Sequence, residues 1–349
     1  MIDIDDIKKA YEKINPYVHK TPFIHSNSFS TLAGATVYLK AENLQKTGSF
    51  KVRGAFNKIL NIPGDKVIAA SMGNHAQGVA YAAGVLGKSA KIVMPVNAPL
   101  VKQEATKGYG AEVLIHGQSF QEALDFAVSQ KDYTFIHAYD DDDIIAGQGT
   151  IGMELVEDAG QVDCVLVPVG GGGLIAGIST ALKSISSDTE IIGVQTECAA
   201  SAYFSFRGKK LIGRPPVSTL ADGIAVGQAG CRTMDAINKY VDDMLLVRED
   251  TIAMAILMFL ERKKLVVEGA GAVPLAALME NKDRFKGKRL ALIVSGGNID
   301  FSLIDKIINK GLVSSGRIGI FEVIVKDIPG SLHALTGLIA ASGGNILNV

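Results

Sequence analysis

Four consecutive glycines are the most suggestive chemical feature of this sequence. An apolar run typical of a buried strand precedes Gly170, Gly171, Gly172 and Gly173, and a helical pattern begins at Leu174. Backbone amides without side chains at a helix start can bind a phosphate group, at the strand ends where open α/β sheets bind ligands. The sequence around them fits neither a Walker loop nor a dinucleotide fingerprint. The alternative is a tight packing turn, although packing rarely requires four glycines.

Three further segments place reactive or polar side chains at similar turns. Lys51 lies in a Gly/Ser turn before a helical pattern, although a solvated surface lysine would look the same. Residues 71–75 follow the strand-like run 67–70, and their amides and short side chains suit a carboxylate or an aromatic hydroxyl. A lone histidine there is more often a core or capping residue than a base. Ser295 follows the apolar run 290–294. Together these residues are the parts of a pyridoxal phosphate site.

With these parts, the sequence resembles the fold type II family of pyridoxal-phosphate enzymes, and within it the threonine/serine dehydratases, also called threonine deaminases or ammonia-lyases. The matching segments occur in the family's order and cover about 5–308. They are residues 49–55, 71–77, 147–150, 168–173, 221–223 and 295–298. The resemblance implies a tryptophan synthase β-like α/β fold, with two open-sheet lobes and the active site between them.

The resemblance also implies the cofactor contacts, position by position. Lys51 would form the Schiff base with pyridoxal 5′-phosphate, and Phe50 would pack on the cofactor ring. Asn74 would bond the ring hydroxyl. The backbone of the four glycines, with the amide of Leu174, would bind the phosphate.

Other matching positions surround the ring and the substrate. Ser295 would face the ring nitrogen, Gly223 would lie beside the ring, and Glu268 would stand one layer behind it. The carboxylate of an amino-acid substrate would be received by Ser71, Gly73, Asn74 and His75.

The implied reaction is a β-elimination. Lys51, once the substrate amine displaces it, is placed to remove the Cα proton, and a desolvated site should lower its pKa so that the amine is neutral. Loss of the β-hydroxyl would convert L-threonine to 2-oxobutanoate and ammonia, and L-serine to pyruvate and ammonia. A neutral serine at the ring nitrogen makes the cofactor a weaker electron sink, which favours prompt elimination over transamination.

Other functions fit parts of the same pattern. A serine racemase, or another fold type II enzyme, shares the framework, but the family's racemases have a serine where this sequence has Met72, and a thioether cannot move a proton. Their divalent-metal site depends on acidic residues at positions occupied here by Gln195 and Ser201, so we expect no required metal. The remaining alternative is a catalytically idle amino-acid sensor, against which the intact Lys51 argues.

Alternating strand-like and helical segments predict an open parallel α/β sheet. Continuous apolar runs at 164–169 and 290–294 predict that helices cover both faces. We expect a lyase domain over residues 1–314, with a smaller lobe at about 66–142 inserted in the larger lobe and closed by a loop at 140–143. The expected strands are 66–70, 90–94, 112–115, 163–169 and 190–196, and the expected helices are 74–86, 100–109, 120–130, 174–184 and 251–264.

The last segment, residues 315–349, predicts a small separate module. A polar Gly/Ser stretch at 311–316 precedes it, and an apolar strand-like run at 318–325 and a helical pattern follow. Together with residues 343–346, these resemble the opening of an ACT domain, a module that binds regulatory amino acids, and a complete module continues further. The segment is too short to bury its own core. The resemblance allows an amino-acid or nucleotide effector and predicts a homodimer or homotetramer.

Composition excludes several other classes of protein. The 349 residues exceed one ordinary domain of about 150, and 35 Lys+Arg against 36 Asp+Glu make nucleic acid and anionic membranes poor partners. Since no apolar run approaches roughly 18 residues and the N-terminus does not read as a signal peptide, we expect a cytoplasmic protein. The cysteines Cys164, Cys198 and Cys231 are too scattered for a disulfide framework or a zinc site.

Overall fold

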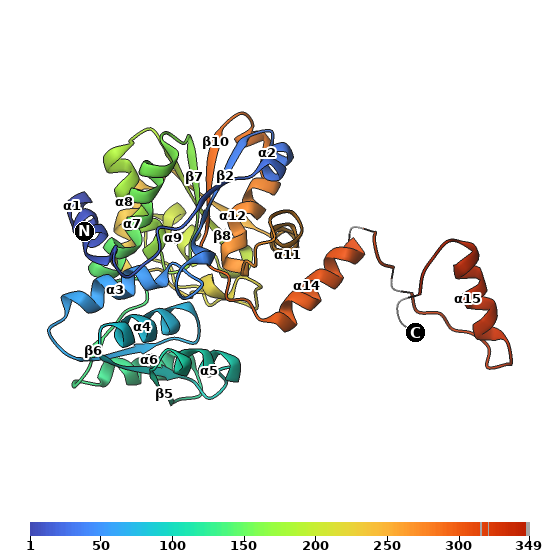
Figure 1. Ribbon diagram of the computed structural model, residues 1–349, viewed down its shortest axis with the longest axis horizontal. Coiled ribbons are helices and arrows are strands. Elements are labelled where there is room, and N and C mark those ends of the chain that lie inside the picture. Colours follow the sequence, from blue (N-terminus) through green and yellow to red (C-terminus); the bar gives the residue numbers. More distant parts are fainter. Residues whose placement is uncertain (315, 320, 347–349) are drawn as a thin grey trace. The chain divides into compact units, whose positions relative to one another are not determined.

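The computed structural model describes residues 1–314, 316–319 and 321–346 (Figure 1). Contacts within the chain divide it into two units, Met1–Ile307 and Ile308–Val349. The first unit contains both β-sheets and every residue that the sequence places at the expected site.

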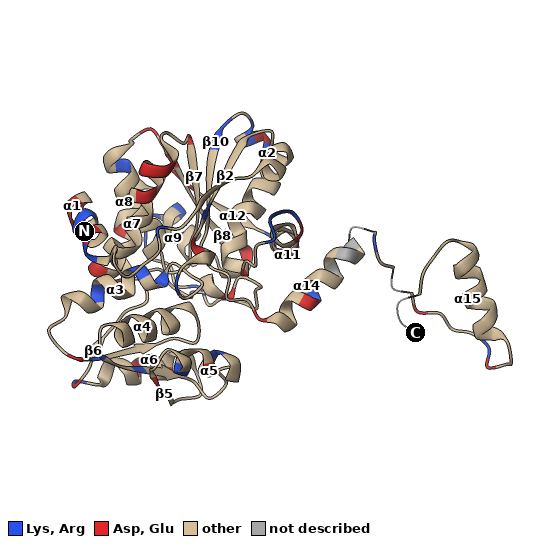
Figure 2. Cartoon of the chain, in the orientation of Figure 1, with Lys and Arg blue, Asp and Glu red and all other residues tan. Residues whose placement is uncertain are grey.

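The larger sheet has six strands in the order β1 (Phe23–His25), β2 (Thr36–Ala41), β10 (Arg289–Val294), β7 (Cys164–Pro168), β8 (Glu190–Thr196) and β9 (Asp243–Val247). All neighbouring strands are parallel except β1 and β2. Helices α8 (Gly173–Ile185) and α12 (Gly269–Glu280) both contact β7, from opposite sides of the sheet in Figure 1. β7 is therefore fully buried, and it is tan throughout in Figure 2 because it carries no charge.

The smaller sheet has four parallel strands in the order β5 (Glu112–Ile115), β4 (Ser89–Met94), β3 (Lys66–Ala70) and β6 (Thr134–Phe135). Alternate residues of β3 face opposite layers. Val67 and Ala69 pack in the cluster that includes α4 (Asn74–Val85), whereas Ile68 and Ala70 pack with α6 (Phe120–Ser129). Helices therefore cover both faces of the smaller sheet as well.

Glycines allow close approach where α7 (Asp142–Ala159) crosses α3 (Lys51–Asn61) and α8. A Cβ on Gly147 would lie 2.6 Å from the Cα of Gly54, and a Cβ on Gly177 would lie 2.5 Å from the backbone nitrogen of Gly149. The segment 147–150 therefore packs helices, and it holds α3 in place relative to α8. The other helices are α1 (Ile4–Ile14), α2 (Asn27–Ala33), α5 (Leu100–Gly108), α9 (Ser201–Gly208), α10 (Cys231–Tyr240), α11 (Glu249–Met258), α13 (Lys282–Phe285), α14 (Phe301–Ser314) and α15 (Ser331–Ala341).

The loop predicted at 140–143 is wrong for its second half, which is helical. The carboxylate of Asp141 accepts hydrogen bonds from the amides of Asp143 and Ile144, so that Asp141 caps the N-terminus of α7 and the helix begins at Asp142. Carboxylates at this end also interact favourably with the helix dipole.

Two helix boundaries also differ from the predictions. Helix α14 extends into the Gly/Ser stretch at 311–316 and ends within it at Ser314; residue 315 lies outside the described part. The helix expected over 251–264 begins at Glu249 as α11 and changes to a π-helical turn at Phe259–Lys263. Among the residues described, no helix has the length and apolar character needed to cross a membrane.

In the second unit, the prediction of a strand at 318–325 is wrong for the residues that the structure describes. Residue 320 lies outside the described part. Residues 321–326 are irregular, and regular structure resumes with α15. A single extended segment without a neighbouring strand leaves its backbone groups unpaired, so it gains little from forming a strand. Phe321 is 85% exposed and Ile324 is 95% exposed.

Candidate active site

Lys51 occupies the first position of α3, directly after the turn at 46–50. Its Nζ donates a hydrogen bond to the carbonyl of Ala138 at 2.8 Å and lies 5.3 Å from the centre of the Phe50 ring. Burial lowers the pKa of the Lys51 amine to about 8, and the Glu268 carboxylate opposes this shift without cancelling it. A neutral amine is therefore accessible close to neutral pH.

The turn before Lys51 is paired with the end of β10. The amide of Phe50 donates to the carbonyl of Ser295 at 3.1 Å, and Ser49 forms an isolated antiparallel bridge with Gly296. Ser295 is buried. The predicted lysine and the predicted serine, distant in sequence, therefore lie on adjacent backbone segments.

The four glycines connect β7 to α8, and side chains from other parts of the chain pack against them. Gly172 has a φ of +97°, and a Cβ there would lie 2.8 Å from Oγ1 of Thr233. A Cβ on Gly171 would overlap the ring of Tyr139. Thr233 also donates its hydroxyl to the Gly171 carbonyl at 2.7 Å. Side chains are thus excluded from this loop, and the free amides that open α8, including that of Leu174, fit a phosphate group.

Tyr139 is a residue of this site that the sequence does not reveal. It follows Ala138, whose carbonyl binds Lys51, and its ring covers Gly171. Its hydroxyl donates to the carbonyl of Gln228 at 3.1 Å. The segment 138–139 therefore connects the lysine to the glycine loop. A tyrosine in front of an acidic run carries no sequence signal for such a position, which depends on contacts with Gly171 and Gln228, both distant in the sequence.

Asn74, at the start of α4, is held by two side chains. Its Nδ2 donates to Oε1 of Glu268 at 2.8 Å, and its Oδ1 accepts from Nδ2 of Asn298 at 2.8 Å. Glu268 is 4% exposed, and burial raises the pKa of its carboxyl group to about 7. Glu268 thus contacts the predicted cofactor ligand directly. Asn298 belongs to a matching segment but has no predicted role.

The residues expected at the substrate carboxylate contribute unequally. His75 is 4% exposed, and its Nε2 lies 2.9 Å from the carbonyl oxygen of Ile136. Burial lowers the pKa of its imidazole to about 3, so the ring is neutral. Oγ of Ser71 accepts from the Gly73 amide at 3.2 Å, and the space beside Gly73 is open. An anion here would meet Ser71 and the first amides of α4 rather than a charged histidine.

Gly223 lies between the Glu268 carboxylate and the glycine loop. A Cβ on Gly223 would lie 3.5 Å from Oε1 of Glu268, and a Cβ on Gly170 would lie 3.1 Å from the Cα of the residue after Gly223. Next to it, Asp222 pairs with Lys102 of α5 at 2.8 Å. This ion pair connects a helix beside the smaller sheet to the loop that borders the site.

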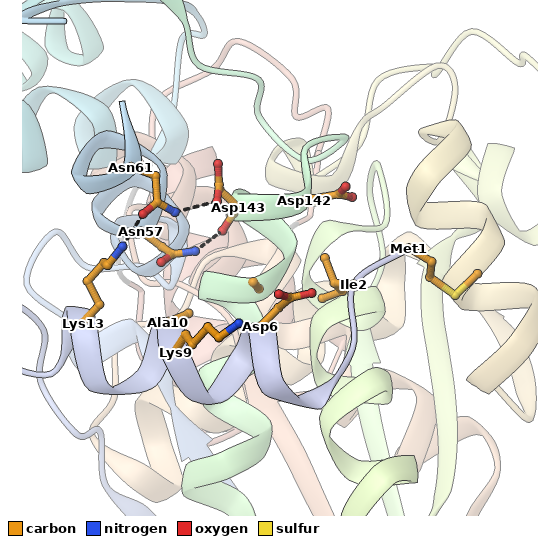
Figure 3. A pocket seen from close by; sticks show the side chains of 11 residues that line it. Met1, Ile2, Asp6, Lys9, Ala10, Lys13, Asn57, Asn61, Asp142 and Asp143 are labelled. Atoms are coloured by element: carbon orange, nitrogen blue, oxygen red, sulfur yellow. Dashed lines mark hydrogen bonds between the residues drawn. The ribbon is translucent and has the colours of Figure 1, made fainter. Parts of the chain in front are cut away.

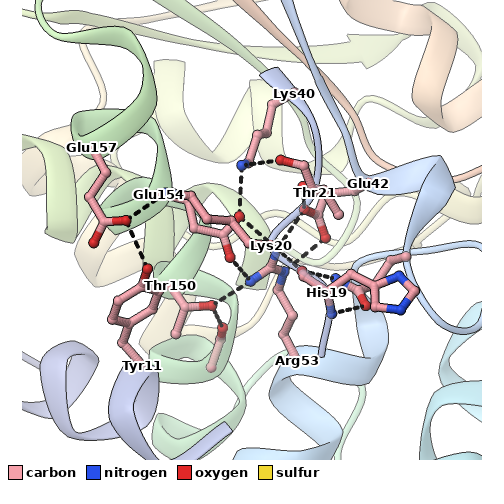
Figure 4. Close-up of polar contacts among 12 residues, drawn as sticks. Tyr11, His19, Lys20, Thr21, Lys40, Glu42, Arg53, Thr150, Glu154 and Glu157 are labelled. Carbon is pink, nitrogen blue, oxygen red and sulfur yellow. Dashed lines mark hydrogen bonds and ion pairs between the residues drawn. The ribbon is translucent and has the colours of Figure 1, made fainter. Parts of the chain in front are cut away.

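A buried ionic cluster supports α3 two residues after Lys51 (Figure 4). Arg53 has no exposed surface and pairs with Glu42 at 2.8 Å and with Glu154 at 2.6 Å. Lys40 pairs with Glu154 at 2.7 Å and with Asp158 at 3.2 Å, so two cations face three carboxylates. These charges outweigh the effect of burial and raise the pKa of Arg53. Through Arg53, Lys40 and Glu154, the cluster joins α3 to β2 and α7 near the start of the helix that carries Lys51.

The cavity in Figure 3 is separate from these residues. It has a volume of about 350 Å³ and is lined by residues of α1, α3 and α7 and by the two residues that begin the chain. Across its edge, Nδ2 of Asn61 donates to the Asp143 carboxylate at 2.6 Å. The predicted cofactor and substrate ligands all lie outside its lining.

Comparison with known proteins places this arrangement in a family. Residues 14–296 match the family described as pyridoxal-phosphate dependent enzyme. An L-threonine ammonia-lyase of Thermotoga maritima is 49% identical, over 100% of this chain and 88% of that protein. The structure of a T.th. threonine deaminase has a TM-score of 0.83 and 42% identity, over 86% of this chain and 99% of that one. Maize serine racemase has a TM-score of 0.83 and 34% identity, over 90% and 99%. The predicted fold class is confirmed, and the chain belongs to the family of pyridoxal-phosphate dependent enzymes.

Proposed function

We propose that this protein is an L-threonine ammonia-lyase, which converts L-threonine to 2-oxobutanoate and ammonia and accepts L-serine to give pyruvate. The observation that carries the proposal is the position of Lys51. Its amine has a lowered pKa and is bound by the segment that covers the glycine loop, beside the strand end at Ser295. Relatives named threonine ammonia-lyase and threonine deaminase support the choice of substrate.

The residues around Lys51 suit pyridoxal 5′-phosphate. The four glycines and the Leu174 amide would bind its phosphate, and Phe50 and Ser295 would contact its ring. Gly223 would lie beside the ring, and a Cβ on it would be 3.5 Å from Oε1 of Glu268. When bound, the cofactor supplies an electrophilic carbon for the substrate amine and an electron sink for the charge that develops at Cα.

Lys51 carries out the proton transfer. Its neutral amine takes the proton from Cα, and desolvation favours the uncharged form that this step needs. The electron pair of that bond forms the Cα–Cβ double bond as the β-hydroxyl leaves with one proton as water. The enamine that results is hydrolysed to the 2-oxo acid and ammonia, so one water is lost and one is consumed. Ser71 and the amides at the start of α4 would hold the carboxylate during these steps.

Serine racemisation is the second candidate, because a racemase is as similar in fold as a threonine deaminase. Racemisation needs a second acid or base, and Met72 instead packs against an apolar cluster. At the positions of the racemases' metal ligands, Gln195 accepts from the Tyr203 amide at 2.8 Å and Ser201 donates to the Val226 carbonyl at 2.8 Å. Both side chains therefore serve α9 and the loop beside it.

We also propose the organisation and regulation that the sequence predicts: a lyase domain over 1–314 with a smaller lobe at about 66–142, an ACT-like segment at 315–349, an amino-acid or nucleotide effector, and a homodimer or homotetramer. The exposed apolar side chains of Phe321 and Ile324 support a segment that needs a partner surface. Sedimentation of the purified protein, with and without amino acids and nucleotides, tests assembly and effector binding.

The proposed function is tested in one cuvette. The visible spectrum of the purified protein should show bound cofactor, and addition of L-threonine should give 2-oxobutanoate, measured with a coupled dehydrogenase. Lys51→Ala should lose both the visible band and the product, whereas Lys58→Ala, in the same helix, should keep both. D-Serine accumulating from L-serine without any 2-oxo acid would refute the lyase in favour of a racemase.

A further inference from the structure

Asn298 lies where three of the predicted cofactor-binding segments meet. Its Nδ2 donates one hydrogen bond to the carbonyl of Thr47, in the turn before Lys51, and another to Oδ1 of Asn74, both at 2.8 Å. Asn298 itself follows Ser295 by three residues at the end of β10. One side-chain amide therefore connects the lysine turn, the start of α4 and the serine strand end.

The backbone is shaped around this side chain. Gly48 has a φ of +70°, and a Cβ there would lie 2.5 Å from Oδ1 of Asn298. The Gly48 carbonyl accepts from the Gly297 amide at 2.9 Å, which fixes the two turns side by side. A Cβ on Gly297 would lie 2.7 Å from the Val266 carbonyl oxygen. Both glycines are needed to bring the Asn298 amide up to its two acceptors.

The direction of each hydrogen bond in this series, from Thr47 through Asn298 and Asn74 to Glu268, follows from the groups at its two ends. The Thr47 carbonyl can only accept, so Asn298 must turn its NH₂ group toward it. The same NH₂ group then reaches Asn74, which must offer Oδ1 in return, and this leaves the Asn74 NH₂ group facing Glu268. With one of its N–H groups on Glu268, Asn74 retains the other as a donor for a further acceptor. If the Asn298 amide were reversed, two carbonyl oxygens would face each other.

We propose that Asn298 is a positioning residue that holds the Asn74 amide as a hydrogen-bond donor toward the ring hydroxyl of the cofactor. The proposal rests on the predicted contact between Asn74 and that hydroxyl. A donor in this position stabilises the ionised ring oxygen, whereas an acceptor stabilises the protonated hydroxyl. Asn298 thus acts on the electronic state of the cofactor through Asn74, without touching the cofactor itself.

Asn298→Asp tests this proposal with little change of shape. A carboxylate cannot donate, so the Asn74 amide should rotate to donate to Asp and present Oδ1 to the cofactor. The same rotation turns Oδ1 toward Glu268, whose raised pKa allows its carboxyl group to hold a proton and donate it to Asn74. We expect absorption of the bound cofactor to move from the visible band of the ionised ring oxygen toward the near-ultraviolet band of the protonated form. Asn43→Asp is the matched control, because Asn43 also lies beside Gly297 and donates to a backbone carbonyl, that of Val266 at 3.1 Å, but does not contact Asn74.

Affinity for pyridoxal 5′-phosphate gives a second readout. In titrations of the cofactor-free protein, Asn298→Ala should weaken binding about tenfold, the value of one well-placed hydrogen bond. In the Asn74→Ala background, the same change should have no further effect, because Asn298 acts through Asn74. Melting curves identify any variant that fails to fold, and the alanine series replaces the aspartate variant in that case.

The outcomes separate this inference from the proposed function. Wild-type protein that does not bind the cofactor would refute the proposed function itself. Wild-type protein that binds the cofactor, with an unchanged spectrum in Asn298→Asp, or with tenfold effects that multiply in the double variant, would overturn the role of Asn298 alone.

Discussion

Lys51 should destabilise the cofactor-free protein at neutral pH. Burial lowers the pKa of its amine from 10.5 to about 8, so between these pH values the unfolded chain holds a proton that the folded protein does not. Stability therefore falls as the pH is lowered through this window and stays lower below pH 8. The full shift corresponds to roughly 3 kcal/mol, and partial exposure of the residue reduces the expected effect to about 2 kcal/mol. Lys51→Met, which keeps the side-chain volume, should recover this free energy at pH 7.

Urea denaturation of cofactor-free wild-type and Lys51→Met proteins, at neutral pH and at a pH above the usual lysine value, measures the effect. The variant should be the more stable protein at neutral pH, and its advantage should vanish in the alkaline series. Lys58→Met is the control, because Lys58 pairs with Asp141 at 2.7 Å and Asp143 at 3.1 Å. Loss of those pairs should lower stability by up to about 1 kcal/mol. An advantage of Lys51→Met that does not change with pH would refute the reasoning.

Two further variants test the surroundings of the site. Gly172→Ala places a Cβ at a φ of +97°, 2.8 Å from Oγ1 of Thr233. We therefore expect the free energy of unfolding to fall by about 1–3 kcal/mol and cofactor binding to weaken in titrations. Unchanged affinity would contradict the role of the loop in binding the phosphate. Arg53→Met leaves the carboxylates of Glu42 and Glu154 with too little positive charge, so the urea midpoint should fall by the equivalent of about 3–5 kcal/mol, and a neutral result would show that the cluster does not support α3.

The predicted strands succeeded where apolar runs are continuous. β3, β5 and β8 have the predicted ends, and β4 begins one residue earlier. β3, β4 and β8 are mostly buried, and the turns beside them carry polar residues or glycine, whereas β5 lies at the edge of its sheet with half-buried and exposed residues. β2 was not predicted, since Lys40 interrupts its apolar pattern. The structure supplies the reason: Lys40 is fully buried and paired with Glu154, a partner that no local pattern can identify.

The chemical groups of the site were readable from the sequence, because a reactive lysine, a run of glycines and a serine at a strand end reflect local backbone and side-chain requirements. The contacts that hold these groups in place were not readable from the sequence. Tyr139 on the glycine loop, and Asn298 between Thr47 and Asn74, depend on contacts between segments far apart in the chain. The strand expected at 318–325 failed for the same reason, since a strand forms only when tertiary structure provides a neighbour. Sequence alone determined which groups are present; packing decided which groups hold them in place.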